Sequence, residues 1–223
     1  MLNCVMELII SFFQLLGLCL LFKIILGIYR NCLRPAYDLK KRYSQKNGAP
    51  LWACVTGGTD GLGLAYCKTL AQRGFNIVII SRNPQKLADV RESLNKLYPD
   101  IEVRVVEADF SEFNESKNPC EWFKEIDSEL ESLDIGLFIN NAAWSKEGAV
   151  RKLNPAHLKT IIDINTTPYA MLLRGVIPRM LERDSRSGII NVSSLAANLP
   201  LPGLAAYTGS KKFNENLSLS LAA

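Results

Sequence analysis

Hydrophobic and polar residues divide the chain into one long apolar stretch and a series of short alternating segments. From Leu8 to Tyr29 the apolar stretch is interrupted only by Ser11, Gln14 and Lys23. At about 1.5 Å per residue, a helix over this stretch would span roughly 33 Å, which is enough to cross a bilayer. Lys23 lies near one end, where its long side chain can reach the headgroups. The pattern predicts a transmembrane anchor over residues 1–29.

Two other interpretations of this stretch remain open, a signal peptide and a buried core helix. A signal peptide has a basic start, a shorter apolar run and a cleavage site of small residues, whereas here Glu7 and no basic residue precede the run. A basic segment follows directly, and we interpret residues 30–50 as a juxtamembrane linker. Because positive residues stay on the cytoplasmic side, we expect the remaining chain to face the cytosol. The basic residues are Lys23, Arg30, Arg34, Lys40, Lys41, Arg42 and Lys46.

After residue 50, apolar segments of strand length alternate with helical segments. Five strands are predicted, at Leu51–Val55, Asn76–Ile80, Glu102–Glu107, Asp134–Asn140 and Gly188–Val192. Helices are predicted at Gly61–Arg73, Pro84–Leu97, Pro119–Leu133, over most of Pro155–Leu181 and at Tyr207–Leu221. Strands separated by helices are typical of a parallel sheet that is covered on both faces. We therefore expect an α/β fold with a Rossmann-type, doubly wound parallel sheet over residues 51–223.

Composition and charge exclude several functional classes. Apolar residues make up 48% of the chain and charged residues 22%, which is incompatible with a disordered protein. The net charge is +4, but the segment Lys23–Lys46 holds an excess of six positive charges, so the rest of the chain is at about −2. A nucleic-acid-binding domain needs a basic patch of its own, and we expect no nucleic acid partner. The six cysteines form no CxxC pair and His157 is the only histidine, so we expect neither a metal site nor a disulfide scaffold.

A glycine-rich turn follows the first predicted strand and opens the next helix. It reads TGGTDGLG over residues 56–63. Gly57 permits a tight turn, while Gly61 and Gly63 let the backbone approach a pyrophosphate whose charge is met by the helix N-terminus. Glycines also occur in strand-to-helix turns that bind nothing, so the motif alone leaves both interpretations open. The residues of this turn that we expect to contact a cofactor are Gly57, Thr59, Asp60, Gly61, Leu62 and Gly63.

The end of the second strand bears on the choice of dinucleotide. A site for NAD usually places an acidic residue there, for the ribose 2′-hydroxyl. Here that place holds Ser81 and Arg82, and a guanidinium can pair with a 2′-phosphate. We therefore expect NADP(H), although Arg82 could also be an ordinary solvated loop residue. Asp109, after the third strand, is placed to approach the adenine, and Asn141, after the fourth, lies at the cofactor crevice.

A candidate catalytic set lies toward the C-terminus. Tyr207 and Lys211 are four residues apart, which puts them on one face of a helix. A lysine cation beside a phenol favours the phenolate, so Tyr207 could exchange a proton with a substrate oxygen. Ser194, at the C-terminal end of the fifth strand, could hydrogen-bond the same oxygen, and Asn165 lies in the preceding long helix. Tyr and Lys at this spacing are common, so the pair alone favours a structural role over a catalytic one.

Taken together and in this order, the glycine turn, the Asn-Asn-Ala run at 140–142, the asparagine, the serine and the Tyr-Lys pair resemble the short-chain dehydrogenase/reductase family. The resemblance covers residues 51–223 and implies that Tyr207 is the catalytic acid/base and that Ser194 polarises the carbonyl. It also implies that Lys211 binds the nicotinamide ribose and supports the phenolate, and that Asn165 supports a water linking Lys211 to solvent. In that family the nicotinamide supplies the hydride.

The N-terminal anchor, the TGGTDGLG turn and the ISRN run at 80–83 are similar to one branch of this family, the membrane-bound 17β-hydroxysteroid dehydrogenases and very-long-chain 3-oxoacyl-CoA reductases. That resemblance implies an endoplasmic reticulum protein that uses NADPH to interconvert a ketone and an alcohol on a lipophilic substrate, a steroid or a 3-oxoacyl-CoA, and it allows a homodimer. The alternative is a catalytically weak, membrane-tethered binding or scaffold protein on the same fold.

Two features depart from the family pattern. Ala143 stands where the family has glycine, which adds a methyl group near the nicotinamide ribose. The sequence also ends inside the helix that carries Tyr207 and Lys211, whereas the family continues with further strands and helices. We therefore expect a fold that is incomplete at its C-terminus, with the fifth strand as an apolar edge.

Overall fold

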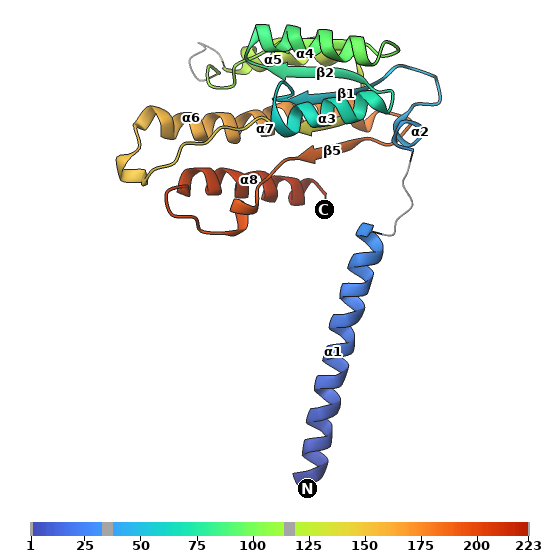
Figure 1. Ribbon diagram of the computed structural model, residues 1–223, viewed down its shortest axis with the longest axis vertical. Coiled ribbons are helices and arrows are strands. Elements are labelled where there is room, and N and C mark those ends of the chain that lie inside the picture. Colours follow the sequence, from blue (N-terminus) through green and yellow to red (C-terminus); the bar gives the residue numbers. More distant parts are fainter. Residues whose placement is uncertain (1, 33–37, 114–118, 223) are drawn as a thin grey trace. The chain divides into compact units, whose positions relative to one another are not determined.

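The computed structural model describes residues 2–32, 38–113 and 119–222, and the chain divides into two compact units. The first unit, Met1–Asp38, contains one long helix, α1 (Leu2–Cys32), shown in blue in Figure 1. Its segment Ile9–Tyr29 has 21 residues, a mean hydropathy of 2.4 and no burial inside the protein, so α1 is a candidate membrane span. Residues 33–37 of the expected linker, with Arg34, lie outside the described residues.

The second unit, Leu39–Ala223, is built on a five-stranded parallel sheet with the order β3-β2-β1-β4-β5. The chain builds outward from β1 to β3 and then returns to the other side of β1 for β4 and β5. This order confirms the doubly wound parallel sheet, and in such sheets ligands bind where the order reverses, at the carboxyl ends of the strands. The strands are β1 (Leu51–Thr56), β2 (Asn76–Ser81), β3 (Val103–Glu107), β4 (Asp134–Asn140) and β5 (Gly188–Asn191).

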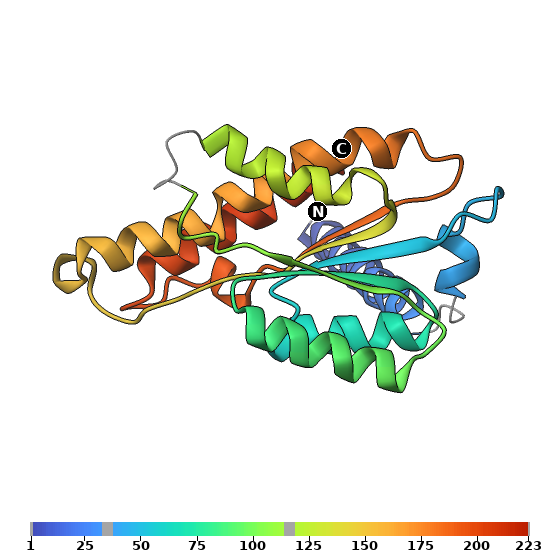
Figure 2. The same ribbon diagram turned by 90° about the horizontal axis from the view of Figure 1, so that it is seen from above.

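Helices cover both faces of the sheet (Figure 2). On one face, α3 (Gly61–Gln72) packs on β1 and β2, and α4 (Pro84–Leu97) packs on β2 and β3. On the other face lie α5 (Pro119–Glu131) and α7 (Thr167–Leu181), which contact each other. The remaining pair, α6 (Pro155–Asn165) and α8 (Ala205–Leu221), pack against each other, and the short helices η1 (Val150–Lys152) and η2 (Leu195–Asn198) lie in the loops before them.

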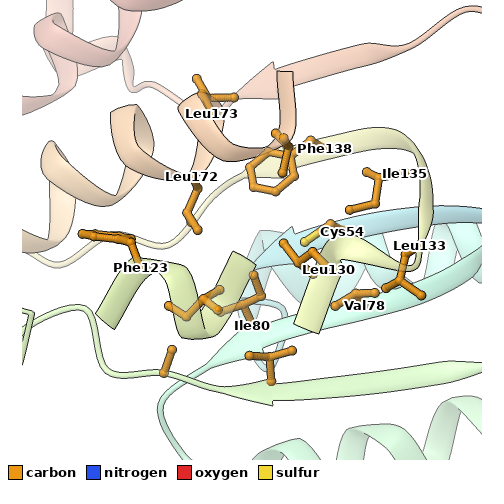
Figure 3. Close-up of a cluster of buried hydrophobic side chains, with 14 of the residues drawn as sticks. Cys54, Val78, Ile80, Phe123, Leu130, Leu133, Ile135, Phe138, Leu172 and Leu173 are labelled. Carbon is orange, nitrogen blue, oxygen red and sulfur yellow. The ribbon is translucent and has the colours of Figure 1, made fainter. Parts of the chain in front are cut away.

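The burial of each strand depends on how many of its faces the helices cover. Every residue of β1 is buried, since helices lie on both faces, and the strand accordingly reads as a continuous apolar run rather than an alternating one. Figure 3 shows the cluster beneath α5 and α7, in which Ile80, Phe138 and Leu172 come from three different elements. Strand β5 is less protected: it lies at the edge of the sheet, none of its residues is buried, and Ile190 is 38% exposed.

One predicted element differs in the structure. The sequence pattern predicts mostly helix across Pro155–Leu181, but the helix ends at Asn165 and restarts at Thr167. Between them Thr166 has φ −120° and ψ −63°, outside the helical range. Pro168 explains the break, because proline has no backbone N–H to donate and, in a continuous helix, its ring would collide with the carbonyl group four residues earlier, at Ile164. The break places Asn165 at a helix end.

Part of the expected linker is structured. The short helix α2 (Leu39–Tyr43) belongs to the second unit. The carbonyl oxygen of Tyr43 accepts hydrogen bonds from Arg183, at 2.6 Å, and from Ser185, at 3.0 Å. Arg183 also pairs with Asp134 at 2.6 Å, and both side chains are nearly buried. These contacts tie the segment before β1 to the loop before β5.

Candidate functional site

Positions in the glycine turn require glycine for two different reasons, a left-handed backbone or a lack of space for a side chain. Gly57 has φ +64° and Gly61 has φ +50°, a left-handed conformation that favours glycine. Gly63 is needed for close approach, because a Cβ there would overlap the Gly57 carbonyl oxygen and lie 2.6 Å from Asn141 Nδ2. Gly58, for which the sequence predicts no role, is also closely packed, against side chains: a Cβ there would lie 2.8 Å from Ile79 and 2.9 Å from Cys67. The turn therefore has an exposed face of backbone and no room for side chains behind it.

Asn141 and Thr56 join the glycine turn to the end of β4. The side chain of Asn141 donates to the carbonyl oxygens of Thr56, at 2.9 Å, and of Gly57, at 3.3 Å. In return, Thr56 Oγ1 accepts from the backbone N–H groups of Asn141, at 2.9 Å, and Ala142, at 3.0 Å. Asn141 thus braces the turn from behind. Sequence reasoning missed Thr56, although a polar residue directly after the apolar run of β1 is a signal that could have indicated it.

Asp60 caps helix α3 at the turn. Its carboxylate accepts from the Gly61 N–H at 2.8 Å and pairs with Lys86 Nζ at 3.2 Å. The backbone hydrogen bond, followed by the bond and charge of Lys86, holds the pKa of Asp60 below its usual range. Asp60 therefore stays ionised, and its side chain accepts only the first N–H group of α3, that of Gly61.

The residues at the ends of β2 and β3 are joined in pairs. Arg82 lies 3.9 Å from Asp109, and the Arg82 side chain is 60% exposed, so its guanidinium is open to solvent. Asp109 is held by the backbone N–H and the hydroxyl of Ser111, at 2.9 Å and 2.7 Å. The hydroxyls of Thr59 and Ser81 are 3.0 Å apart. This edge therefore offers one accessible cation beside a fixed carboxylate.

A cavity of about 420 Å³ lies above this edge and brings most of the predicted cofactor residues together. Its wall continues past the end of β4 to Ala142, Ala143, Trp144 and Ile164. Thr59, Gly63 and the predicted catalytic residues are not among the described residues that line it. The predicted cofactor residues that do line it are Gly57, Asp60, Gly61, Leu62, Ser81, Arg82, Asp109 and Asn141.

Lys211 is buried beneath Tyr207 in the catalytic set. Only 2% of Lys211 is exposed, and its Nζ lies 5.9 Å from the centroid of the Tyr207 ring. The ammonium donates to the carbonyl oxygen of Val192 at 2.9 Å and to the hydroxyl of Tyr169 at 3.4 Å. Burial lowers the pKa of Lys211 to about 8. The helical spacing of Tyr207 and Lys211 thus brings them together as predicted, but Tyr169 and Val192 were missed.

Asn165 connects the wall of the cavity to the helix of Tyr207. It is fully buried, and its Oδ1 accepts from the Trp144 N–H at 2.8 Å while its Nδ2 donates to the Trp144 carbonyl oxygen at 2.9 Å. Nδ2 also donates to Ser210 Oγ at 3.0 Å, and Ser210 in turn donates to the Tyr207 carbonyl oxygen at 2.7 Å. The side chain of Asn165 therefore braces the loop after β4 against the start of α8.

The two serines after β5 have different partners. Ser193 Oγ donates to the Lys211 carbonyl oxygen at 2.9 Å, which ties β5 to α8. Ser194 is half-buried, and its Oγ accepts from the Ala196 N–H at 3.2 Å as the cap of η2. Ser194, the serine predicted to be catalytic, thus lies at the start of η2, in the segment between β5 and α8.

Comparisons with known proteins agree with this geometry. A family model described as short chain dehydrogenase matches residues 51–223. A very-long-chain 3-oxoacyl-CoA reductase of Anas platyrhynchos is 38% identical over 180 residues, which is 79% of this chain and 55% of that protein. A putative steroid dehydrogenase of Caenorhabditis elegans is 37% identical over 187 residues, 81% of this chain and 55% of that protein.

A solved structure that contains NADPH has a similar fold. The short-chain dehydrogenase from Sphingobium yanoikuyae in complex with NADPH superimposes with a TM-score of 0.68 at 26% identity, over 76% of this chain and 63% of that one. The chain spans about half the length of the curated relatives it matches. The family match, the parallel sheet order and the glycine turn together show that this chain belongs to the short-chain dehydrogenase family.

Proposed function

We propose that residues 51–223 form the cofactor-binding and catalytic part of a membrane-anchored, NADP(H)-dependent oxidoreductase that interconverts a ketone and an alcohol on a lipophilic substrate. The observation that carries this proposal is the buried ammonium of Lys211, whose Nζ lies 5.9 Å from the centroid of the Tyr207 ring. A buried cation next to a phenol lowers the free energy of the phenolate. That is the arrangement needed for proton exchange at a substrate oxygen.

The roles of the residues follow from their positions. Tyr207 donates a proton to the carbonyl oxygen in reduction and takes it back in oxidation. Lys211 stabilises the phenolate that remains, and Ser194 hydrogen-bonds the same oxygen. Asn165 holds the Trp144 loop and, through Ser210, the first turn of the Tyr207 helix. Its support of a water beside Lys211 is part of the same proposal. When bound, the nicotinamide supplies or accepts the hydride.

The cradle around the glycine turn fits a dinucleotide. A side chain at Gly63 would collide with backbone, and four residues of the turn, Gly57, Asp60, Gly61 and Leu62, line the 420 Å³ cavity. The capped N-terminus of α3 provides N–H groups and a positive dipole end for a pyrophosphate. Arg82 supplies an accessible guanidinium for a 2′-phosphate, and no acidic residue replaces it at the end of β2. These features favour NADP(H) over NAD(H).

The substrate class and the location rest on the relatives and on α1. Relatives are named very-long-chain 3-oxoacyl-CoA reductase and putative steroid dehydrogenase, so we propose a steroid or a 3-oxoacyl-CoA as the substrate. The apolar α1 would anchor the chain in the endoplasmic reticulum membrane, with residues 30–50 as linker. Because the segment after α1 is basic, the cofactor domain would lie on the cytosolic side.

Substitution of Tyr207 tests the chemistry. Tyr207→Phe keeps the ring and its packing but removes the hydroxyl, so ketone reduction should fall by about 10²- to 10⁴-fold while NADPH binding, measured by fluorescence, persists. Tyr66→Phe, on α3 and away from the cavity wall, is the matched control. If the wild type binds NADPH yet reduces neither ketosteroids nor 3-oxoacyl thioesters, the scaffold alternative is favoured. Wild-type turnover in Tyr207→Phe would refute the mechanism.

Substitution of Arg82 tests the cofactor. Arg82→Asp removes the cation and adds a negative charge, so affinity for NADPH should fall by roughly tenfold or more while affinity for NADH changes little. Lys68→Asp, an exposed cation on α3, controls for the change in net charge. Equal losses for both cofactors in Arg82→Asp would assign Arg82 a structural role only.

Protease protection tests the location. In sealed microsomes that contain the full chain, added protease should digest the cofactor domain and leave a membrane-protected fragment from the N-terminus. Detergent-opened microsomes are the control for protease resistance. A domain that resists the protease until detergent is added would contradict the cytosolic orientation.

A further inference from the structure

A second buried phenol lies against Lys211, and neither the motif nor the proposed reaction accounts for it. Tyr169, in the first turn of α7, has no exposed surface. Its hydroxyl is 3.4 Å from Lys211 Nζ, and the centroid of its ring is 5.5 Å from the same atom. The ammonium is thus closer to the ring of Tyr169 than to the ring of Tyr207, which is at 5.9 Å.

Lys211, Tyr169 and the carbonyl group of Val192 are joined to one another by hydrogen bonds. Lys211 Nζ donates to the Val192 carbonyl oxygen at 2.9 Å and to the Tyr169 hydroxyl. The Tyr169 hydroxyl donates its own hydrogen to the same carbonyl oxygen at 3.3 Å. A neutral phenol has one hydrogen to donate and lone pairs to accept with, so both of these bonds are made at once. The carbonyl oxygen of Val192 uses both of its lone pairs.

Tyr169 is itself held in place. Its backbone carbonyl oxygen accepts from Asn140 Nδ2 at 3.3 Å, which fixes the first turn of α7 to the end of β4. Burial, with a further contribution from Tyr207, raises the pKa of Tyr169 above its ordinary value. The phenol therefore remains neutral wherever Lys211 is charged, and it can accept a hydrogen bond from the ammonium.

The groups that face Lys211 come from several elements, and Tyr169 is the one on α7. On its own helix α8 the facing group is Tyr207, at the end of β5 it is the Val192 carbonyl, and on α7 it is Tyr169. The neighbouring α6 presents Asp163, which is ion-paired with Lys159. Burial is the cause that lowers the pKa of Lys211 to about 8. Among the described residues, Lys211 Nζ donates hydrogen bonds to two oxygens and lies over two aromatic rings.

We propose that Tyr169 is a positioning residue for Lys211, whose hydroxyl and ring hold the ammonium beneath Tyr207 and favour its charged form. The phenol oxygen offers a hydrogen-bond acceptor, and the ring face attracts the cation. Both interactions are stronger with the protonated lysine, because a charged donor strengthens the hydrogen bond and the ring face attracts a positive charge, so they oppose the effect of burial. The inference rests on the proposed function only for its kinetic consequence, since the geometry and the ionisation of Lys211 can be measured without turnover.

The test is a titration of Lys211 in the full chain in detergent, with isotope-labelled lysine followed by NMR and the signal assigned by its loss in Lys211→Met. Tyr169→Phe removes the hydroxyl and keeps the ring, so the pKa of Lys211 should fall by about one unit. Tyr169→Leu removes the ring as well and should lower it further. Tyr98→Phe, a half-buried tyrosine at the end of α4, should leave it unchanged. Thermal unfolding of each variant checks that it is folded.

A kinetic measurement separates this inference from the proposed function. In an active enzyme, the alkaline limb of the kcat profile should move to lower pH in Tyr169→Phe by the same amount as the Lys211 titration, with the KM for the ketone unchanged. An unmoved titration in folded Tyr169→Phe, or an equal shift in Tyr98→Phe, overturns the inference even if the enzyme is active. A shifted titration in a protein without turnover upholds it and contradicts the proposed function instead.

Discussion

The two halves of the candidate site are built in different ways. Around β1 and β2 the cradle is made of backbone, and the strands beneath it are almost entirely buried. Around β5 and α8 the site is made of buried polar side chains that hydrogen-bond to one another, and the strand that supports them is a half-exposed edge. The first half depends on the absence of side chains, and the second half depends on their presence.

The helices of the two halves begin differently as well. The side chains of Asp60 and Asn83 cap α3 and α4 by accepting backbone N–H groups of the first turn. Helix α8, which carries Tyr207 and Lys211, follows Leu204 and has no side-chain cap. Its first turn is held instead by Asn165 and Ser210. Local side chains therefore begin the helices of the cofactor half, whereas a contact between distant segments holds the start of the catalytic helix.

Removing Asn165 should have the largest effect on stability. Asn165→Ala removes the partner of the half-buried Trp144 N–H and carbonyl groups and one of the two partners of the buried Ser210 hydroxyl. The free energy of unfolding, measured with urea, should fall by about 3 kcal/mol or more. Asn95→Ala, on the exposed face of α4, should change it by less than about 0.5 kcal/mol. Similar values for the two variants would show that the catalytic half does not depend on this network.

Adding one methyl group at Gly63 should break the cofactor half. In Gly63→Ala the new Cβ would overlap the Gly57 carbonyl oxygen, so the turn must shift. We expect a loss of roughly 2–3 kcal/mol in stability and loss of NADPH binding by fluorescence titration. The matched variant is Gly209→Ala on α8, where a Cβ meets nothing within 4 Å, and it should stabilise the helix by about 0.5–1 kcal/mol. Normal NADPH binding by Gly63→Ala would contradict the steric account of the turn.

The buried Lys211 should make stability depend on pH. Its pKa is about 8 in the folded protein against an ordinary value of 10.5, so between these values the unfolded chain binds more protons. Stability should therefore rise with pH from about 8 toward 10.5, by on the order of 2 kcal/mol. Lys211→Met should lack this rise, and the difference between the two urea-unfolding curves isolates it. Above pH 10.0 the raised pKa of Tyr169 acts in the opposite direction, so the comparison is made below that value. Parallel curves would contradict the burial of a charged Lys211.

Removing a local cap should have the smallest effect. Asn83 Oδ1 accepts from the Lys86 N–H at 2.9 Å at the start of α4. Asn83→Ala should cost about 1 kcal/mol in the free energy of unfolding, while Asn83→Ser, which keeps a capping oxygen, should cost less. A loss as large as that of Asn165→Ala would remove the distinction between the two halves.

Most of the fold could be predicted because its signals are local. The five strands and the helices between them are visible as apolar runs and periodic segments, and the order of the sheet agrees with the predicted doubly wound architecture. The errors lie at element ends, for example at Thr166, where Pro168 divides a helix that apolar periodicity alone presents as continuous. The pattern of apolar residues is nearly the same on both sides of that break, so periodicity cannot reveal it.

The features of the candidate site also separate into local ones, which the sequence predicts, and contacts between distant segments, which it does not. The glycine turn and the pairing of Tyr207 with Lys211 can be predicted from the sequence, since a turn is defined by adjacent residues and a helix brings residues four apart onto one face. The contacts of Lys211 with Tyr169 and Val192, and of Asn165 with Trp144 and Ser210, are visible only in the folded structure. Tyr169 and Lys211 are 42 residues apart in the chain, and their contact arises because α7 and α8 both pack beside the end of β5. Such contacts follow from the packing of whole elements, and no spacing rule along the chain encodes them.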